Sequence, residues 1–451
     1  MQNKFINDLN PLLKLAVPLA LIGITQSSVF FFETLFLAHV DQQTLAAGAL
    51  VSWLFGVLAT ILFGTLGSIN ILISHKHGAN DEDGIRLVVR DGLLLAGLLT
   101  IPACILFWNM SSVFLFLGQS QSVAILAQSY LHALAWGLLP NFIMIAIYES
   151  IIGLGHAKVI MIFTVLSVCL NIFFSFVFIF GKFGFPVLGI AGAGWGMTIS
   201  YWITVVVLTS YVLLSSKYKK YFFHILNVKK PSFLWELLQI GVPMGTMYCV
   251  EVAFFFVLTL LMGSISSQLL AANQIAFQYM GTLMAVIFSI AQAITVRMGH
   301  LLGAKEIDAA KRAAYMGILI AASFMGIVAV FYWFFPLLLI SADFNVHDPK
   351  NLEIVQDIKK FFMISAVFQI FEAMRISLFG ALRALKDTHF TLLVSIISFW
   401  CIALPLGYLL ATYFHLGGMG LWCGMVVGAS SSAILLYWRF QSKIYRYEPR
   451  N

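Results

Sequence analysis

The chain has 451 residues, of which 61% are hydrophobic and only 10% are charged, and its mean hydropathy is +0.95. An average soluble domain carries about 25% charged residues, so this composition excludes an ordinary soluble protein. The net charge of +7 does not indicate nucleic-acid binding, because the basic residues are spread over short loops and do not cluster on one face.

Long apolar segments recur along the whole chain and predict an all-α integral membrane protein, since about 20 apolar residues cross a bilayer as a helix. The short alternating segments that are typical of a membrane β-barrel are not visible. The first apolar segment is too long for a cleavable signal, so we expect it to remain in the mature protein. Hydropathy predicts twelve transmembrane helices, at about 11–38, 44–74, 87–108, 122–152, 157–181, 187–215, 234–263, 270–299, 309–340, 355–383, 388–414 and 417–439.

The basic residues predict the orientation of these helices. Most Lys and Arg residues lie at the N-terminus, after an even-numbered span or in the C-terminal tail. Cytoplasmic loops carry the excess of Lys and Arg, so both termini are expected in the cytoplasm. The exceptions are Lys182, Lys350, Lys359 and Lys360 on the opposite side and Arg375 within a span.

The sequence also repeats itself. Pro18 corresponds to Pro243, 225 residues later, and the glycine-rich segment 188–196 corresponds to 416–424 at an offset of 228. The glycines of 192–196 open a span and follow no strand, so we expect them to mark close helix packing and not a nucleotide-binding loop.

The repeat predicts two pseudo-symmetric six-helix bundles that form a central cleft. We expect an N-lobe at 1–215, a cytoplasmic linker at 216–233 and a C-lobe at 234–451. Six spans per half is an even number, so the halves share one orientation and are related by an axis along the membrane normal. Transporters of this design bind substrate between their halves, and the sequence therefore favours a transporter that works by alternating access.

Four acidic residues stand within apolar stretches of the predicted spans, namely Glu33, Glu149, Glu251 and Glu372. A charged side chain at the bilayer centre costs about 2.5–3.5 kcal/mol on translocon scales, so each carboxylate requires a partner, a proton or a bound cation. Glu149 lies close to the cytoplasmic end of its span, and we interpret it as an interfacial carboxylate that pairs with a loop cation.

For the other three carboxylates, a salt bridge that joins helices competes with a role in ion coupling. The salt bridge is most plausible for Glu372, because Arg375 lies three residues on and shares its helix face. Spans one and seven hold no comparable base, so Glu33 and Glu251 must carry a proton, bind a cation or reach another helix. A buried carboxyl suits a proton carrier, whereas several oxygen ligands suit a hard cation such as Na⁺.

The candidate site residues form three groups. The C-lobe coupling set is Glu251, Glu372 and Arg375, with Na⁺ possible at the two carboxylates. The other two groups consist mainly of polar side chains whose oxygens could bind an ion or a substrate. Each of these polar side chains could equally form a hydrogen bond between helices, worth about 0.6–2 kcal/mol. The N-lobe coupling set is Glu33, Asn171, Ser175 and Thr198, and the substrate-cavity candidates are Gln26, Gln274, Gln278 and Phe368.

Several segments together resemble the MATE (multidrug and toxic compound extrusion) family, in its NorM-like branch. QSSVFFFETLFLAH places Glu33 at the acidic position of the first span, and Glu251 matches the glutamate that follows the G-x-P opening of span seven. FQIFEAM places Glu372 at the acidic position of span ten, and GALRALKDT resembles the loop signature that follows it. LNIFFSFVFIFGKFGFPVLGIAGAGWG is similar to the family's segment of spans five and six, with Asn171 on its asparagine.

The resemblance implies a multidrug antiporter of the bacterial inner membrane that exports amphiphilic, often cationic compounds in exchange for Na⁺ or H⁺. It further implies a monomer in contact with lipid, without a cofactor or enzymatic activity. The sequence departs from the family at Glu33 and Glu372, where Asp is commoner, and at Ser175, where a stronger ligand is often found. Arg375 is unusual, and its fixed charge would favour an ionised Glu372 while weakening the hold of that carboxylate on a cation.

Two other functions fit the sequence less well. A lipid-linked oligosaccharide flippase of the same superfamily would need a cationic cavity for its pyrophosphate, and few basic residues lie within the spans. An intramembrane enzyme would need clustered His, Asp or Ser residues near one face, and the sequence offers no such cluster. ATP drive is not expected, because the chain has no Walker A sequence.

Overall fold

The computed structural model describes residues 2–223, 232–341, 346, 348 and 351–447. These residues are almost entirely helical, and twelve helical segments among them are long and apolar enough to cross a membrane. The twelve lie close to the segments predicted from hydropathy, so the prediction of an all-α membrane protein is confirmed. Large apolar side chains such as Phe31, Trp53 and Ile162 are exposed, as is typical of helix faces that contact lipid.

The chain packs into two compact units. The N-terminal unit is Leu21–Gly245, and the C-terminal unit combines Met1–Ala20 with Thr246–Asn451. The divisions fall inside α1 (Gln2–Ala38) and α10 (Leu234–Ile265), the first and seventh spans of the chain. The contacts therefore divide the chain inside two helices. The sequence repeat instead places the division at the 216–233 segment. The lobe boundaries drawn from the repeat stay a prediction.

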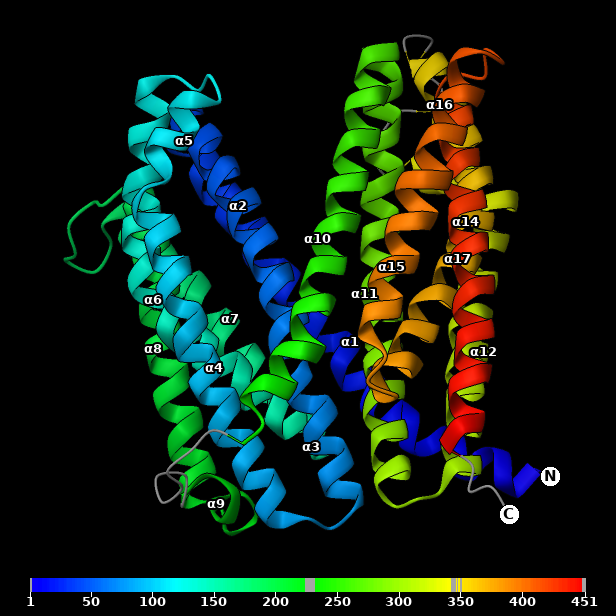
Figure 1. Cartoon of the computed structure of the whole chain (residues 1–451). Coiled ribbons are helices and arrows are strands. Elements are labelled where there is room, and N and C mark those ends of the chain that lie inside the picture. Colours follow the sequence, from blue (N-terminus) through cyan, green and yellow to red (C-terminus); the bar gives the residue numbers. More distant parts are fainter. Residues whose placement is uncertain (1, 224–231, 342–345, 347, 349–350, 448–451) are drawn as a thin grey trace. The chain divides into compact units, whose positions relative to one another are not determined.

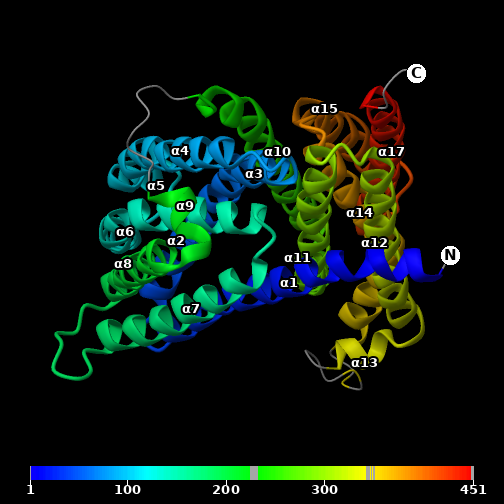
Figure 2. The ribbon, with the colours of Figure 1, turned by 90° about the horizontal axis from the view of Figure 1, so that it is seen from below.

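In the N-terminal unit, α6 is the central helix. It contacts α2, α3, α4 and α8, and α8 in turn packs along α7 (Figures 1 and 2). In its most apolar stretch 78% of the residues are buried, against 39% for α4 and for α8. The helices of this unit between α1 and α10 are α2 (Gln42–Leu66), α3 (Ser68–Gly78), α4 (Glu82–Trp108), α5 (Met110–Phe116), α6 (Gln121–Gly153), α7 (Ala157–Phe180), α8 (Ile190–Leu214) and α9 (Ser216–Phe222).

In the C-terminal unit, α14 takes the central place and contacts α11, α12 and α17. It is the tenth span and the repeat counterpart of α6, and 67% of its most apolar stretch is buried. Span eleven is not a regular α-helix, because a π-helical stretch, η3, separates α15 from α16. The helices after α10 are α11 (Ser267–Gly303), α12 (Ile307–Phe334), α13 (Pro336–Ile340), α14 (Leu352–Ala384), α15 (Thr388–Ser395), η3 (Ile396–Ala403), α16 (Leu404–Thr412) and α17 (Gly418–Tyr447).

The repeated glycines allow helices to approach closely in both units. A Cβ atom at Gly196 of α8 would lie 2.5 Å from the backbone nitrogen of Ser175 in α7. A Cβ atom at Gly420 of α17 would likewise lie 2.5 Å from the nitrogen of Ala411 in α16. Both distances are too short for a side chain, so the interpretation of these glycines as helix-packing positions is confirmed.

The beginning of α10 is fixed by a buried carboxylate of the same unit. Asp91 of α4 is completely buried and accepts the backbone N–H groups of Ser232 (2.7 Å) and Phe233 (2.6 Å), which directly precede α10. Its other oxygen pairs with Arg90 at 2.7 Å. Asp91 therefore satisfies donors that a helix N-terminus leaves without an intrahelical partner.

Candidate functional site

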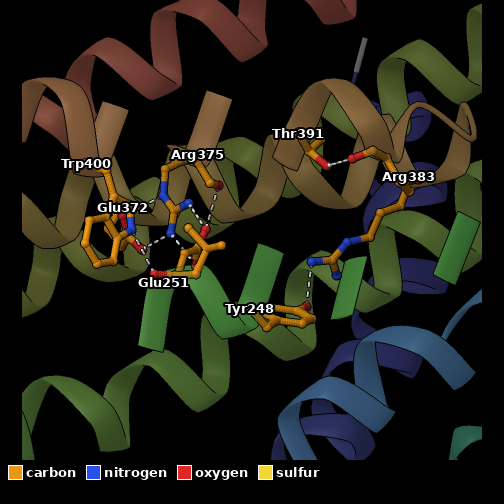
Figure 3. Close-up of polar contacts among 10 residues, drawn as sticks. Tyr248, Glu251, Glu372, Arg375, Arg383, Thr391 and Trp400 are labelled. Carbon is orange, nitrogen blue, oxygen red and sulfur yellow. Dashed lines mark hydrogen bonds and ion pairs between the residues drawn. The ribbon is translucent and has the colours of Figure 1, made fainter. Parts of the chain in front are cut away.

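Three ionisable side chains meet inside the C-terminal unit, where Arg375 of α14 lies between Glu372 of the same helix and Glu251 of α10 (Figure 3). Arg375 Nε donates to Glu372 Oε2 at 2.7 Å, and Nη1 donates to Glu251 Oε1 at 2.6 Å. Nη2 donates to Glu251 Oε2 at 3.2 Å and also to Glu372 Oε1. Each of the four carboxylate oxygens therefore accepts an N–H of the same guanidinium.

Side chains from span eleven complete the surroundings of this triad, Glu251–Arg375–Glu372. Ser395 Oγ donates to Glu251 Oε1 at 2.8 Å, and the Phe399 ring lies 4.8 Å from Arg375 Cζ. Trp400 Nε1 donates to the carbonyl oxygen of Val250, next to Glu251, at 3.1 Å. These residues end α15 or belong to η3, and π-helical turns inside α-helices are frequent at functional sites.

The triad is a buried group of three charges, and the sequence indicated only one of its two ion pairs. The spacing of Glu372 and Arg375 indicated their pairing, but the contact of Arg375 with Glu251 bridges 124 positions and has no local signal. A second cation about 4 Å from the guanidinium would be repelled by about 4 kcal/mol at an effective dielectric constant of about 20. In this conformation the oxygens of Glu251 and Glu372 are thus engaged by Arg375 and do not form an open cation site.

A second arginine of α14 also bonds to α10. Arg383 Nη2 donates to Tyr248 Oη at 2.5 Å, and the guanidinium carbon lies 5.1 Å from the centre of the Tyr248 ring (Figure 3). Arg383 belongs to the GALRALKDT segment, whose Asp387 accepts Arg439 Nε at 2.7 Å. Tyr248 could not be singled out from the sequence, because nothing in α10 distinguishes it from the other aromatic side chains of that helix.

The N-terminal unit holds Glu33 in a different environment. Glu33 is only 2% exposed, and its Oε2 accepts the hydroxyl of Tyr130 from α6 at 3.0 Å. Its other oxygen, Oε1, has no hydrogen-bond partner in the part of the chain that the structure describes. Glu33 is thus a buried carboxylate whose recorded hydrogen-bond donor is neutral. Tyr130 was not foreseen, because nothing in the α6 sequence distinguishes it from a core aromatic.

A cavity of about 140 Å³ lies within the same unit. Gln26 of α1 and Asn171 of α7 line it, together with aromatic and methionine side chains such as Phe30, Phe55 and Met144. Met197 also lines it, and the Sδ atom of Met197 lies 3.7 Å from Tyr130 Oη. The Glu33–Tyr130 pair therefore lies next to a residue of the cavity wall. The structure brings Gln26 and Asn171 together on this cavity, as two of the predicted site residues.

Other predicted site residues serve helix packing. Ser175 lies at the contact of α7 with Gly196, and Thr198 Oγ1 donates to the Ala133 carbonyl oxygen of α6 at 2.7 Å. Phe368 is fully buried, with its ring centre 6.2 Å from that of Trp422, so it belongs to the core of the C-terminal unit.

Gln274 and Gln278 are exposed on α11, in the C-terminal unit, whereas Gln26 lies in the N-terminal unit. Glu149 is 1% exposed and accepts the side-chain amide of Asn70 from α3. The interpretation of Glu149 as an interfacial side chain was therefore wrong, because α3 covers the end of α6 at this point. Among the described residues no group of three or more His, Cys, Asp or Glu side chains could hold a metal ion.

Comparisons with known proteins agree with this architecture. The MatE family model matches residues 18–177 and 243–409, and the two matches begin 225 residues apart, at the offset of the sequence repeat. "Probable multidrug resistance protein NorM" of Synechocystis sp. is 30% identical over 96% of this chain and 94% of its own length. The protein of the same name from Halalkalibacterium halodurans is 32% identical, over 96% and 94%.

A solved structure supports the fold independently of these sequences. It is described as an outward-facing conformation of a multidrug resistance MATE family transporter of the MOP superfamily, and it matches with a TM-score of 0.88. The match covers 98% of this chain and 97% of the solved chain at 20% identity, which shows the common fold alone. Taken with the family model and the relatives, it leads to one conclusion: the chain belongs to the MatE family and is a multi-pass membrane transporter.

Proposed function

We propose that this transporter is a secondary antiporter that exports amphiphilic, often cationic organic compounds in exchange for H⁺ or Na⁺. The names of its relatives support multidrug export, since two proteins called NorM are 30% and 32% identical over nearly the whole chain. The observation that carries the proposal is the environment of Glu33, a buried carboxylate near a cavity, one oxygen of which has no hydrogen-bond partner among the described residues.

The cavity walls suit substrates of varied shape. Phe30, Phe55, Met144 and Met197 offer aromatic and thioether surface, which packs softly and adapts to different apolar bodies. Gln26 and Asn171 add amide groups that can donate or accept hydrogen bonds. A compound with an apolar body and a positive charge would match these walls and the nearby carboxylate.

Competition between ion and substrate for Glu33 would couple ion uptake to substrate export. A coupling cation or proton on Glu33 removes the negative charge that attracts a cationic substrate, and its departure restores that charge. A ligand shifts a conformational equilibrium only by its differential affinity for the two states, so this exclusion is enough to link ion uptake to export. The Lys and Arg distribution supports cytoplasmic termini. The bacterial relatives support the bacterial inner membrane as the location.

Dye efflux from proteoliposomes tests this proposal. Purified protein is reconstituted with a fluorescent organic cation inside, and pH and Na⁺ gradients are imposed separately. We expect gradient-driven efflux by the wild type and its loss in Glu33→Gln, which keeps the shape of the side chain but cannot ionise. Thr34→Val is the matched control, because Thr34 Oγ1 bonds only to the Phe30 carbonyl of its own helix among the recorded contacts. Equal efflux by the wild type and Glu33→Gln would contradict the role of Glu33, and an inactive wild type would contradict antiport.

A flippase for a lipid-linked oligosaccharide is the alternative function. Its pyrophosphate would require basic side chains in the binding cavity, because phosphate groups are recognised by Arg and Lys. In the described part of the chain, the cavity of the N-terminal unit is lined by apolar, amide, hydroxyl and phenol groups and by no Lys or Arg. Arg375 is already paired with two carboxylates. These observations favour export of organic cations.

A further inference from the structure

We propose that Arg375 determines the ion specificity of the C-terminal unit: its guanidinium takes the place of a free coupling cation between Glu251 and Glu372, so this unit binds no Na⁺. One consequence, that ion coupling falls to Glu33, rests on the proposed antiport function. The absence of Na⁺ binding in the C-terminal unit does not, and it can be tested without a transport assay.

Arg375 already engages all four oxygens of the two carboxylates. A hard cation needs several oxygen ligands, and ionised carboxylates are the strongest that a protein offers. All four oxygens of Glu251 and Glu372 already accept N–H groups of Arg375, and Glu251 Oε1 accepts the Ser395 hydroxyl as well. An incoming Na⁺ would have to displace the planar guanidinium, which bonds to one carboxylate on each of two sides.

The guanidinium cation of Arg375 cannot leave the site or lose its charge. Arginine stays protonated in proteins, and Arg375 is held on the same helix as Glu372, three residues away. A tethered ligand acts at a high effective concentration, so it outcompetes a free ion of similar intrinsic affinity. Four of the five guanidinium N–H donors are used in the recorded contacts.

The guanidinium of Arg375 is also enclosed by aromatic rings. Arg375 is 0% exposed, and the rings of Phe379 and Phe399 lie 4.6 Å and 4.8 Å from its Cζ atom. Aromatic faces stabilise an arginine cation but offer no oxygen ligand to Na⁺. Phe399 belongs to η3, so the irregular part of span eleven contributes to holding the arginine.

Sodium binding to the purified protein tests the inference. The melting temperature is measured in NaCl and in choline chloride at the same ionic strength, and heats of Na⁺ binding are measured by calorimetry. We expect no Na⁺-specific change in the wild type. In Arg375→Gln we expect a saturable rise in Tm of about 2–4 °C with Na⁺, because the carboxylates are then free to take the ion.

Further variants guard against a failure to fold. The double variant E372Q/R375Q keeps the net charge of the site, because it removes one charge of each sign, and it should fold and gain a Na⁺ response through Glu251. R375K, which keeps a tethered cation, should remain insensitive, as should E251Q/E372Q/R375Q, which has no carboxylate. A Na⁺ response of the wild type that disappears in E372Q would overturn the inference. So would Na⁺ insensitivity of both R375Q and E372Q/R375Q when at least one of them is folded.

The same proteins separate this inference from the proposed function. If the wild type exports no dye but the binding pattern is as expected, antiport fails while the role of Arg375 stands. If dye efflux depends on a Na⁺ gradient and persists in E33Q but is lost in E372Q, the C-terminal unit takes up Na⁺ and the inference fails while antiport stands.

Discussion

The carboxylates of the two units are buried to nearly the same degree but have different partners. Glu33 is 2% exposed, and Glu251 and Glu372 are 6% and 4% exposed. In the C-terminal unit an arginine on the central helix bonds every carboxylate oxygen, whereas in the N-terminal unit a neutral phenol on the central helix bonds only one. Equal burial therefore does not imply equal function, because what decides the state of a buried charge is the group that compensates it.

The comparison also shows how far a duplicated fold constrains its side chains. The central helices α6 and α14 are repeat counterparts and are each the most buried span of their unit. The offset of 225 carries Glu33 onto Leu258, so the carboxylates are not symmetry mates. Duplication preserved the glycine contacts that pack the helices, while the polar groups between the helices diverged.

The largest effect is expected from removing the cation of the triad. Arg375→Met leaves two carboxylates buried without a counter-charge, which should lower the free energy of unfolding by about 3–5 kcal/mol. Thermal unfolding of the detergent-purified protein measures this loss. The triple variant E251Q/E372Q/R375M should recover most of it, because no uncompensated charge is left. Equal stability of the single and triple variants would show that the triad is not an ionised network.

A smaller loss of stability is expected at Asp91, a buried carboxylate of the N-terminal unit that bonds to two backbone N–H groups and to Arg90. Asp91→Ala removes the acceptor of Ser232 N–H and Phe233 N–H, and we expect a loss of about 1.5–3 kcal/mol, the usual contribution of a hydrogen bond to a charged group. Hydrogen exchange at these two amides should accelerate, while the ion requirement of dye efflux should not change. Unaltered exchange would contradict the contact.

The Tyr130 phenol should stabilise the Glu33 carboxylate only weakly. The double-mutant cycle of Y130F and E33Q should give a coupling energy of about 1 kcal/mol, because one neutral donor bonds one oxygen. The same analysis between Arg375 and Glu372 should give a clearly larger coupling. If the two couplings were equal, the contrast between the units would fail. The free energies come from unfolding of the four proteins of each cycle.

The smallest effect is expected at Thr198, which the sequence suggested as a coupling residue and the structure places in a bond between α6 and α8. Thr198→Val should cost about 0.6 kcal/mol, the mean value for hydrogen bonds between membrane helices. The Na⁺ and pH dependence of dye efflux should match that of the wild type. A changed ion dependence would return Thr198 to the coupling site.

The sequence by itself determined the membrane class, the twelve spans, the duplication and the four acids that stand within apolar segments. These features are encoded locally, because bilayer thickness sets the length of an apolar segment and a carboxylate within it stands out. The resemblance to the MATE family was also visible in short segments around Glu33, Glu251 and Glu372, and the MatE match over both halves confirmed it.

Only the tertiary structure decided which groups these acids meet. Tyr130 lies 97 positions from Glu33, Arg375 lies 124 positions from Glu251, and Ser395 lies 144 positions from Glu251. Such contacts depend on how each helix is rotated and where it crosses its neighbours, and hydropathy carries no information on either. For the same reason the sequence could not show that Ser175, Thr198 and Phe368 pack helices together, or that an arginine rather than an open space lies between the two C-terminal carboxylates.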